Sequence, residues 1–116
     1  MELGIKIMKA KQEDILIAEF MGWSYLHEIN EFQDLVGQKF HKEVYYSTSW
    51  SWLMPVIEKI EMLDYTFEKN YQRVDNDWQS LIVKGNDILF QEFNIDSIKS
   101  SYYVVVEFIK WHNENK

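Results

Sequence analysis

The chain is predicted to fold as an α+β protein with a small antiparallel sheet, and three observations indicate this class. Residues 64–71 alternate between apolar and polar side chains, and residues 80–91 contain a two-residue turn flanked by apolar runs. Apolar residues recur at helical spacing near residues 50–63 and 96–113. We expect a three-stranded meander, one extra strand and about three helices, an order compatible with an α/β/α sandwich.

Composition limits the class of protein and its partners. The 116 residues are 47% hydrophobic and 16% aromatic, which predicts a folded core and one domain over residues 1–116. The net charge of −7 argues against nucleic acid as the main partner, because nucleic-acid affinity comes mainly from clustered Lys and Arg. The absence of Cys excludes disulfides and thiolate chemistry.

The sequence predicts a cytoplasmic protein with no membrane partner. Its longest uninterrupted apolar run, Tyr102–Val106, is far shorter than the ~20 residues of a membrane-spanning helix. Acidic residues at Glu2, Glu13 and Asp14 interrupt the N-terminal segment, which therefore does not resemble a secretory signal.

The N-terminal third is the least regular part of the sequence. Residues 1–11 alternate apolar and polar types, which is compatible with an N-terminal strand or with a frayed terminus. Residues 12–21 have the pattern of a short helix, and Gly22 is a typical residue to end it. Residues 23–37 show no clear period.

A strand followed by a helix is predicted next. Residues 40–46 are rich in aromatic and β-branched residues, which favours a strand. Residues 47–49 are Ser, Thr and Ser, hydroxyl residues that commonly cap a helix. A helix is expected over 50–63, and Pro55 is tolerated best if the helix starts close to Ser49 or Ser51.

The two-residue turn Gly85-Asn86 predicts a hairpin and its register. Val83 should face Ile88, Ile82 should face Leu89, and Leu81 should face Phe90. This register places four apolar residues on one face, which we expect to be the core face: Leu81, Val83, Ile88 and Phe90.

The last element is predicted to be a helix over 96–113, capped by Asn94 or Asp96. Its buried face should contain residues at the i, i+4, i+7 and i+11 positions: Ile98, Tyr102, Val105 and Ile109.

Three stretches carry a family resemblance: Leu16–Trp23, Tyr45–Glu61 and Val104–Lys116. They resemble small proteins of bacterial genomes and their phages, and are similar to the phage ABA-sandwich domain group. Tyr45–Glu61 is the specific block. The chain has Ser51 where relatives often carry an acid, and His112 where they often carry a Tyr. The resemblance implies a fold and a phage or mobile-element background in a bacterial cytoplasm, and it implies no activity.

No pattern of chemistry-bearing residues identifies a reaction. His27 and Glu31 would share a face of a helix, but no third metal ligand accompanies them. The hydroxyls of residues 47–49 lack the glycines of a nucleophile elbow, and the four Gly form no phosphate-binding loop. We therefore assign no catalytic, cofactor-binding or metal-binding residue, and we expect no cofactor.

The aromatic residues are the strongest indication of function. Trp50 and Trp52 point about 200° apart on a helix, so both are buried only if two layers flank that helix. The alternative is one exposed Trp, a residue type that commonly anchors interfaces. Tyr45 and Tyr103 are further candidates for exposure. These four residues predict a non-enzymatic protein-interaction domain that binds a protein partner or forms a homodimer.

A second hypothesis is a small-ligand-binding domain or an enzyme with an aromatic-lined pocket. Its candidate lining residues are Tyr71, Trp78, His41 and Asp75. A pocket with buried ionisable groups would favour this second hypothesis, and a flat exposed aromatic patch would favour the interaction hypothesis.

Overall fold

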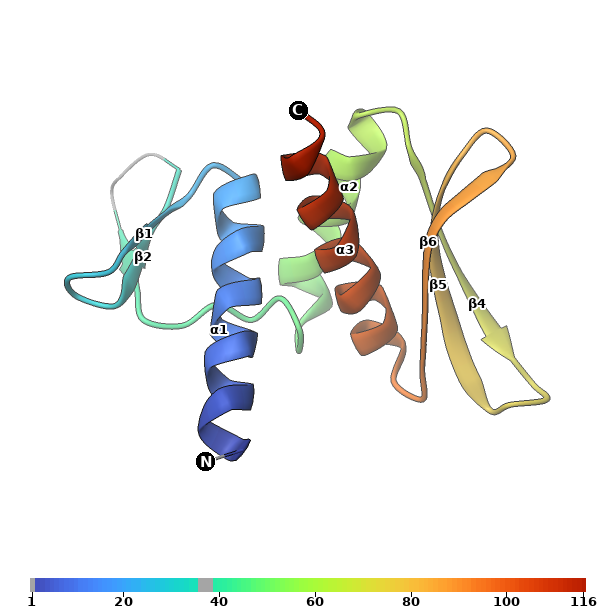
Figure 1. Ribbon diagram of the computed structural model, residues 1–116, viewed down its shortest axis with the longest axis horizontal. Coiled ribbons are helices and arrows are strands. Elements are labelled where there is room, and N and C mark those ends of the chain that lie inside the picture. The colour runs from blue at the N-terminus through green and yellow to red at the C-terminus, as the bar shows by residue number, and fades with distance from the viewer. Residues whose placement is uncertain (1, 36–38) are drawn as a thin grey trace. The chain divides into compact units, whose positions relative to one another are not determined.

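The computed structural model describes residues 2–35 and 39–116, and the side chains from residue 11 on within those ranges. Three helices and two three-stranded antiparallel sheets in these ranges make an α+β fold, as the sequence predicts (Figure 1). The chain divides into two compact units, Met1–Val44 and Tyr45–Lys116, which are described separately below. The expectation of one domain stays a prediction.

The first unit begins with α1, a helix over Glu2–Phe20. The prediction of a strand or frayed terminus is therefore wrong from residue 2 on, and residue 1 lies outside the described residues. The segment is composed mostly of Leu, Met, Lys, Ala, Ile and Glu, residue types that a helix accommodates at little cost. Extending a helix that has already formed is also much easier than starting one.

Gly22 ends α1, as predicted. Its φ is +88°, in the left-handed region, and its N–H donates to the carbonyl of Glu19. The N–H of Trp23 donates to the carbonyl of Ala18 at 2.9 Å. These two bonds are those of a Schellman motif, in which glycine avoids the steric cost of a Cβ.

A small sheet completes the first unit. Strands β1 (Ser24–Leu26), β2 (Glu31–Gln33) and β3 (Phe40–His41) pair in that order. The segment without a clear period therefore contains a hairpin. Phe32 is its buried residue and contacts Tyr25 edge-on at 4.9 Å.

The extra strand predicted over residues 40–46 is much shorter and does not extend the meander. Only its first two residues are in a strand, and they pair with β2. The chain turns at Tyr45, whose carbonyl accepts hydrogen bonds from the N–H groups of Thr48 and Ser49. The aromatic and β-branched composition of 42–46 is therefore overridden by the turn that leads into the next helix.

The second unit begins with α2, over Trp50–Met62, close to the predicted bounds. Ser49 is the N-cap, but its hydroxyl does not cap the helix and lies 2.8 Å from the Ser51 hydroxyl instead. Pro55 lies in the second turn, where it offers no N–H to the carbonyl of Ser51.

Strands β4 (Thr66–Gln72), β5 (Asp77–Lys84) and β6 (Asp87–Asn94) form the predicted meander. The hairpin at Gly85 is confirmed: its φ is +64°, and Val83 faces Ile88. Beyond this pair the predicted register is wrong, because Ile82 faces Phe90. The extra residue is Leu89, and it makes a β-bulge in β6.

Helix α3 spans Ser97–Glu114, and of the two predicted caps, Asn94 or Asp96, the N-cap is Asp96. The Asp96 carboxylate accepts from the N–H of Ile98 at 3.1 Å, and the Asn94 side chain accepts from the N–H of Asp96 at 2.9 Å. The predicted buried face is confirmed, since all four of its residues are buried: Ile98, Tyr102, Val105 and Ile109.

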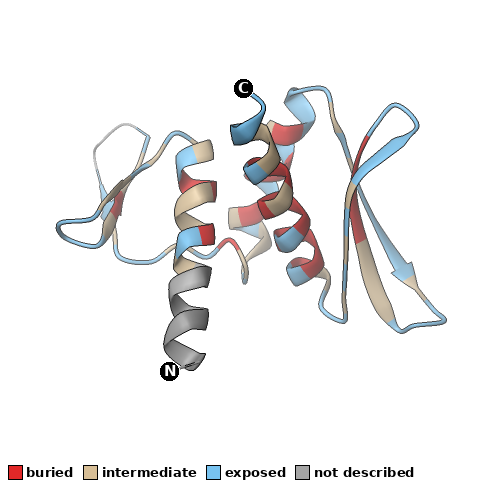
Figure 2. Ribbon diagram, in the orientation of Figure 1, coloured by how far each residue is buried: buried red, intermediate tan, exposed pale blue. Residues whose placement is uncertain are grey.

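Both helices of the second unit lie on one face of its sheet, as Figures 1 and 2 show. This face contains Ser80 and Ile82 of β5, both fully buried. The Ser80 hydroxyl lies 2.8 Å from the Ser100 hydroxyl and 3.0 Å from the Ser101 hydroxyl of α3. These small side chains let α3 approach the sheet closely.

The helices therefore cover the face opposite to the predicted core face, so that prediction is wrong, although Leu81 and Val83 are buried as predicted. Leu81, Val83 and Ile88 lie on the opposite face, which we call the outer face, and the bulge turns Phe90 toward the helices. Residues 45–116 place no helix on the outer face, so the second unit has two layers, whereas an α/β/α sandwich would have three.

Candidate functional site

The outer face of the β4–β5–β6 sheet has an apolar centre. Leu81 and Val83 of the central strand are buried between side chains of the neighbouring strands. Ile88, directly opposite Val83, is 55% exposed, and Phe93 is 51% exposed. Within residues 45–116, no further layer of structure covers these groups. The outer face therefore exposes two large apolar side chains of β6, Ile88 and Phe93, on either side of Gln91.

Polar residues surround this apolar centre. The Gln72 amide donates to the Gln79 carbonyl oxygen at 3.2 Å, and the Gln79 amide donates to Gln91 at 3.0 Å. This row of amides crosses all three strands and fixes their side chains. The remaining polar positions of the outer face follow from the register: Thr66, Glu68, Asn70 and Asp77.

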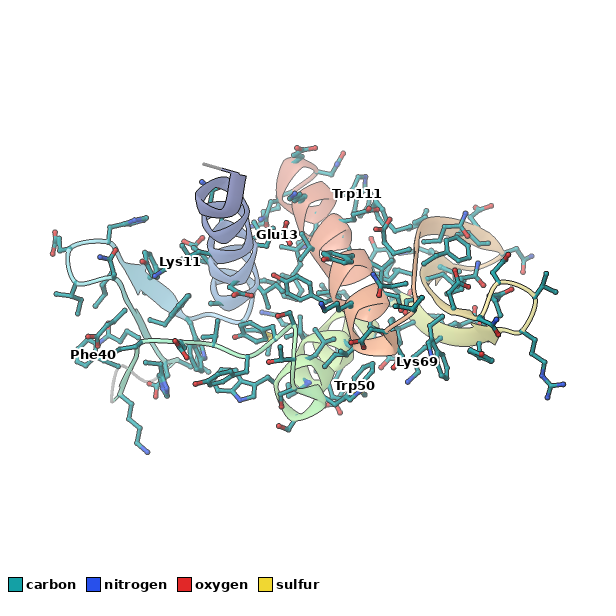
Figure 3. The ribbon with its side chains drawn as sticks, turned by 90° about the horizontal axis from the view of Figure 1, so that it is seen from below. Lys11, Glu13, Phe40, Trp50, Lys69 and Trp111 are labelled. Atoms are coloured by element: carbon teal, nitrogen blue, oxygen red, sulfur yellow. The ribbon has the colours of Figure 1, made fainter. Side chains whose placement is uncertain are left out.

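The helix-facing side of the same sheet carries the lysines. Lys84 lies over the Tyr65 ring, with its ammonium nitrogen 4.7 Å from the ring centroid. Lys69 lies over Trp50 at 4.4 Å and over Trp78 at 5.2 Å, and Figure 3 shows Lys69 beside Trp50. Acidic and neutral polar groups therefore remain on the outer face, and the cations of the sheet lie on the other.

The four predicted anchor residues separate into three places. Trp50 is half-buried against Lys69. Trp52 is also half-buried, and it contacts Tyr45 at 5.5 Å and Tyr46 at 5.6 Å, both edge-on. Tyr45 is 46% exposed.

Tyr103 is exposed on α3 and contacts Tyr102 edge-on at 5.6 Å. Because Trp50 and Trp52 are both half-buried, neither one is the single exposed Trp that the helical geometry allowed. The exposed anchors are the two tyrosines.

The residues proposed to line a pocket are only partly brought together. Tyr71 and Trp78 face each other across β4 and β5, with ring centroids 5.1 Å apart. Asp75 lies in the turn between these strands. His41 belongs to the first unit, where it stacks on Trp23 at 4.9 Å and lies 3.6 Å from the Asp34 carboxylate.

A pair of carboxyl groups joins α3 to β6, and sequence reasoning did not find it. Glu107 of α3 shares a hydrogen bond with Glu92 of β6. Burial, this hydrogen bond and the Glu92 charge raise the pKa of Glu107 from 4.5 to about 7, against the opposing charge of Lys110. The two residues are far apart in the sequence and in different elements, so no local pattern signals their contact.

No metal-binding site is evident in the described parts of the chain. His27 lies in the turn between β1 and β2 rather than on a helix, and its ring contacts Tyr25 edge-on at 4.8 Å. Among the side chains of residues 11–35 and 39–116, no three His, Asp or Glu gather where a metal ion could bind. No described helix is long and apolar enough to cross a bilayer.

Comparison with known proteins identifies no relative of this chain. No protein-family model, no curated protein and no solved structure matches this chain.

Proposed function

We propose that this chain is a non-enzymatic protein-interaction domain that binds its partner through the outer face of the β4–β5–β6 sheet. The observation that carries this proposal is the exposure of Ile88 and Phe93 beside the apolar residues Leu81 and Val83. Large apolar side chains exposed together on one face of a small protein are typical of docking sites. An apolar centre within a polar rim is also the usual anatomy of a protein interface.

Charge indicates the kind of partner. The outer face carries the acids Glu68 and Asp77, whereas Lys69 and Lys84 are held against aromatic rings on the other face. Two copies of the outer face would bring like charges together, which costs free energy. A different protein with basic groups around an apolar centre is therefore favoured over a homodimer.

The cellular setting is part of the proposal and is supported by the resemblance alone. A phage-type accessory protein would act in the bacterial cytoplasm on a host or phage protein. Nucleic acid is not an expected partner, because the outer face presents acids and amides to solvent.

A second surface is also a candidate for the same function. Tyr45 leaves almost half of its side chain exposed while its ring rests against Trp52. A tyrosine held in this way loses little side-chain entropy on binding, which favours an anchor role. The experiment below therefore tests both surfaces.

The test is a quantitative capture experiment with tagged protein and lysate of the native bacterial host. The outer-face variant is Ile88→Glu with Phe93→Glu, and the second variant is Tyr45→Ala. The control is Val74→Glu, which adds a charge at a residue 94% exposed in the β4–β5 turn. Circular dichroism and light scattering establish that each variant is folded and show its oligomeric state.

A stoichiometric protein captured by the wild type and by Val74→Glu, but not by the outer-face variant, supports the proposal. If only Tyr45→Ala loses the captured protein, the second surface around Tyr45 is the binding site and the outer face is not. If the wild type captures no protein and is monomeric, the interaction proposal is wrong, and a small ligand becomes the better hypothesis.

A further inference from the structure

Lys69 places its ammonium group against two tryptophans from different elements. The nitrogen lies 4.4 Å from the ring centroid of Trp50, the first residue of α2, and 5.2 Å from that of Trp78 in β5. Both distances are within the ~6 Å range of cation–π attraction. Lys84 contacts a single ring, that of Tyr65, whereas Lys69 has two tryptophans around one cation, which is a more specific environment.

A third ring extends this aromatic wall. Tyr71 lies two residues after Lys69 in β4, and its ring centroid is 5.1 Å from that of Trp78. Its hydroxyl donates to the Asn76 side chain at 3.3 Å, which orients the ring. The strand pairing and this hydrogen bond therefore hold the rings in place before any ligand binds.

No carboxylate takes part in this environment. In residues 45–116, which are described in full, no Asp or Glu lies within ion-pair distance of the Lys69 ammonium. This is notable in a chain with 19 acidic residues. A site that holds a cation by ring faces rather than by an ion pair favours a methylated ammonium, because that group attracts water less strongly than a primary ammonium.

Lys69 itself is able to leave. Its side chain is exposed and reaches the rings on a flexible four-carbon stem. It therefore competes with an external cation for the rings without closing the site permanently.

We propose that Trp50, Trp78 and Tyr71 form a binding site for a methylated ammonium group, which Lys69 occupies when no ligand is bound. Choline head groups and trimethyl-lysine side chains share this chemistry. The site is on the helix-facing side of the sheet, so it stands independently of the docking function proposed for the outer face.

The proposal is tested by titrating tetramethylammonium chloride into the full-length protein at constant ionic strength. Indole N–H resonances report binding at each tryptophan. The variant Lys69→Gln removes the competing cation, and Lys84→Gln is the matched control at a single-ring contact. The neutral molecule tert-butanol, of similar shape, separates the cation effect from apolar contact.

We expect saturable shifts of the Trp50 and Trp78 resonances, with an affinity ~10-fold higher in Lys69→Gln than in the wild type or Lys84→Gln. The double variant Lys69→Gln with Trp50→Leu should lose most of this affinity while keeping its circular dichroism spectrum. Separate titrations with choline and with a trimethyl-lysine peptide then identify the source that binds more tightly.

The proposal is overturned if folded Lys69→Gln shows no saturable shift with tetramethylammonium. It is also overturned if tert-butanol produces the same shifts, or if Lys84→Gln gains as much affinity as Lys69→Gln. Binding at the outer face is measured separately with Ile88→Glu and Phe93→Glu, so each proposal can fail without the other.

Discussion

Raising the pH from acidic values to neutrality is expected to weaken the attachment of α3 to the sheet, because Glu107 shares a hydrogen bond with Glu92 between α3 and β6. Burial and the neighbouring Glu92 raise the pKa of Glu107 from 4.5 to about 7 in the folded protein. Between these two values the folded state keeps a proton that the unfolded state releases. The contribution of this pair to the free energy of unfolding therefore falls as pH rises from 4.5 to about 7, and that contribution is constant outside this window.

The size of this effect follows from the difference between the two pKa values. Each pH unit corresponds to ~1.4 kcal/mol, so the interval from 4.5 to about 7 gives an upper limit of roughly 3 kcal/mol. Glu107 is only half-buried, and water screens its charge, which reduces the expected loss of stability to ~1–2 kcal/mol.

The assay is urea unfolding at several pH values between about 4 and about 8, with tryptophan fluorescence as the readout. Glu107→Gln keeps a neutral hydrogen-bonding side chain and should remove most of the pH dependence. Glu61→Gln, which removes an exposed charge from α2, is the matched control and should retain it. The reasoning is refuted if Glu107→Gln has the same pH dependence as the wild type, or if Glu61→Gln loses it equally.

Three further substitutions test the local arguments by urea unfolding. Gly22→Ala should lower the free energy of unfolding by ~1–3 kcal/mol, because φ at this position is +88° and the new Cβ would lie 2.6 Å from Leu35 Cδ1. An unchanged free energy of unfolding would show that α1 does not need glycine at its C-terminal end. Asp96→Ala should cost ~1 kcal/mol by removing the cap of α3, and Asp96→Asn should recover most of it. Ser80→Val should cost ~1–3 kcal/mol because the larger side chain separates α3 from β5, and Ser80→Ala should cost less; equal costs would argue against close approach as the role of Ser80.

Elements that depend on local signals could be predicted from the sequence. Helix α3 has a long apolar period and a capping residue, Asp96, and its bounds and buried face are as expected. The Gly85-Asn86 turn similarly predicts the first pairs of its hairpin. In these places the residues that decide the structure are neighbours in the chain.

The choice of sheet face could not be predicted, because it depends on distant residues. Leu81, Ile82 and Val83 are consecutive and apolar, so the strand itself is equally suited to either face. Ser100 and Ser101 of α3 contact Ser80, and their small side chains allow α3 to pack on the sheet face that contains Ser80. The sequence consequently predicts that the outer face is the core face, and this prediction is wrong.

The cation site was partly visible in the sequence. Alternation placed Lys69 on the same face of its strand as Phe67 and Tyr71, an unusual position for a charge. The contribution of Trp50 was not visible, since it requires the start of α2 to lie against β4.

The bulge at Leu89 has a consequence for the behaviour of this protein at high concentration. β6 is an edge strand, and an edge with regularly spaced free N–H and C=O groups is a template on which other chains can assemble into aggregates. The extra residue interrupts that spacing and increases the local twist. The sheet can thus expose apolar side chains on its outer face while its β6 edge resists growth into fibrils.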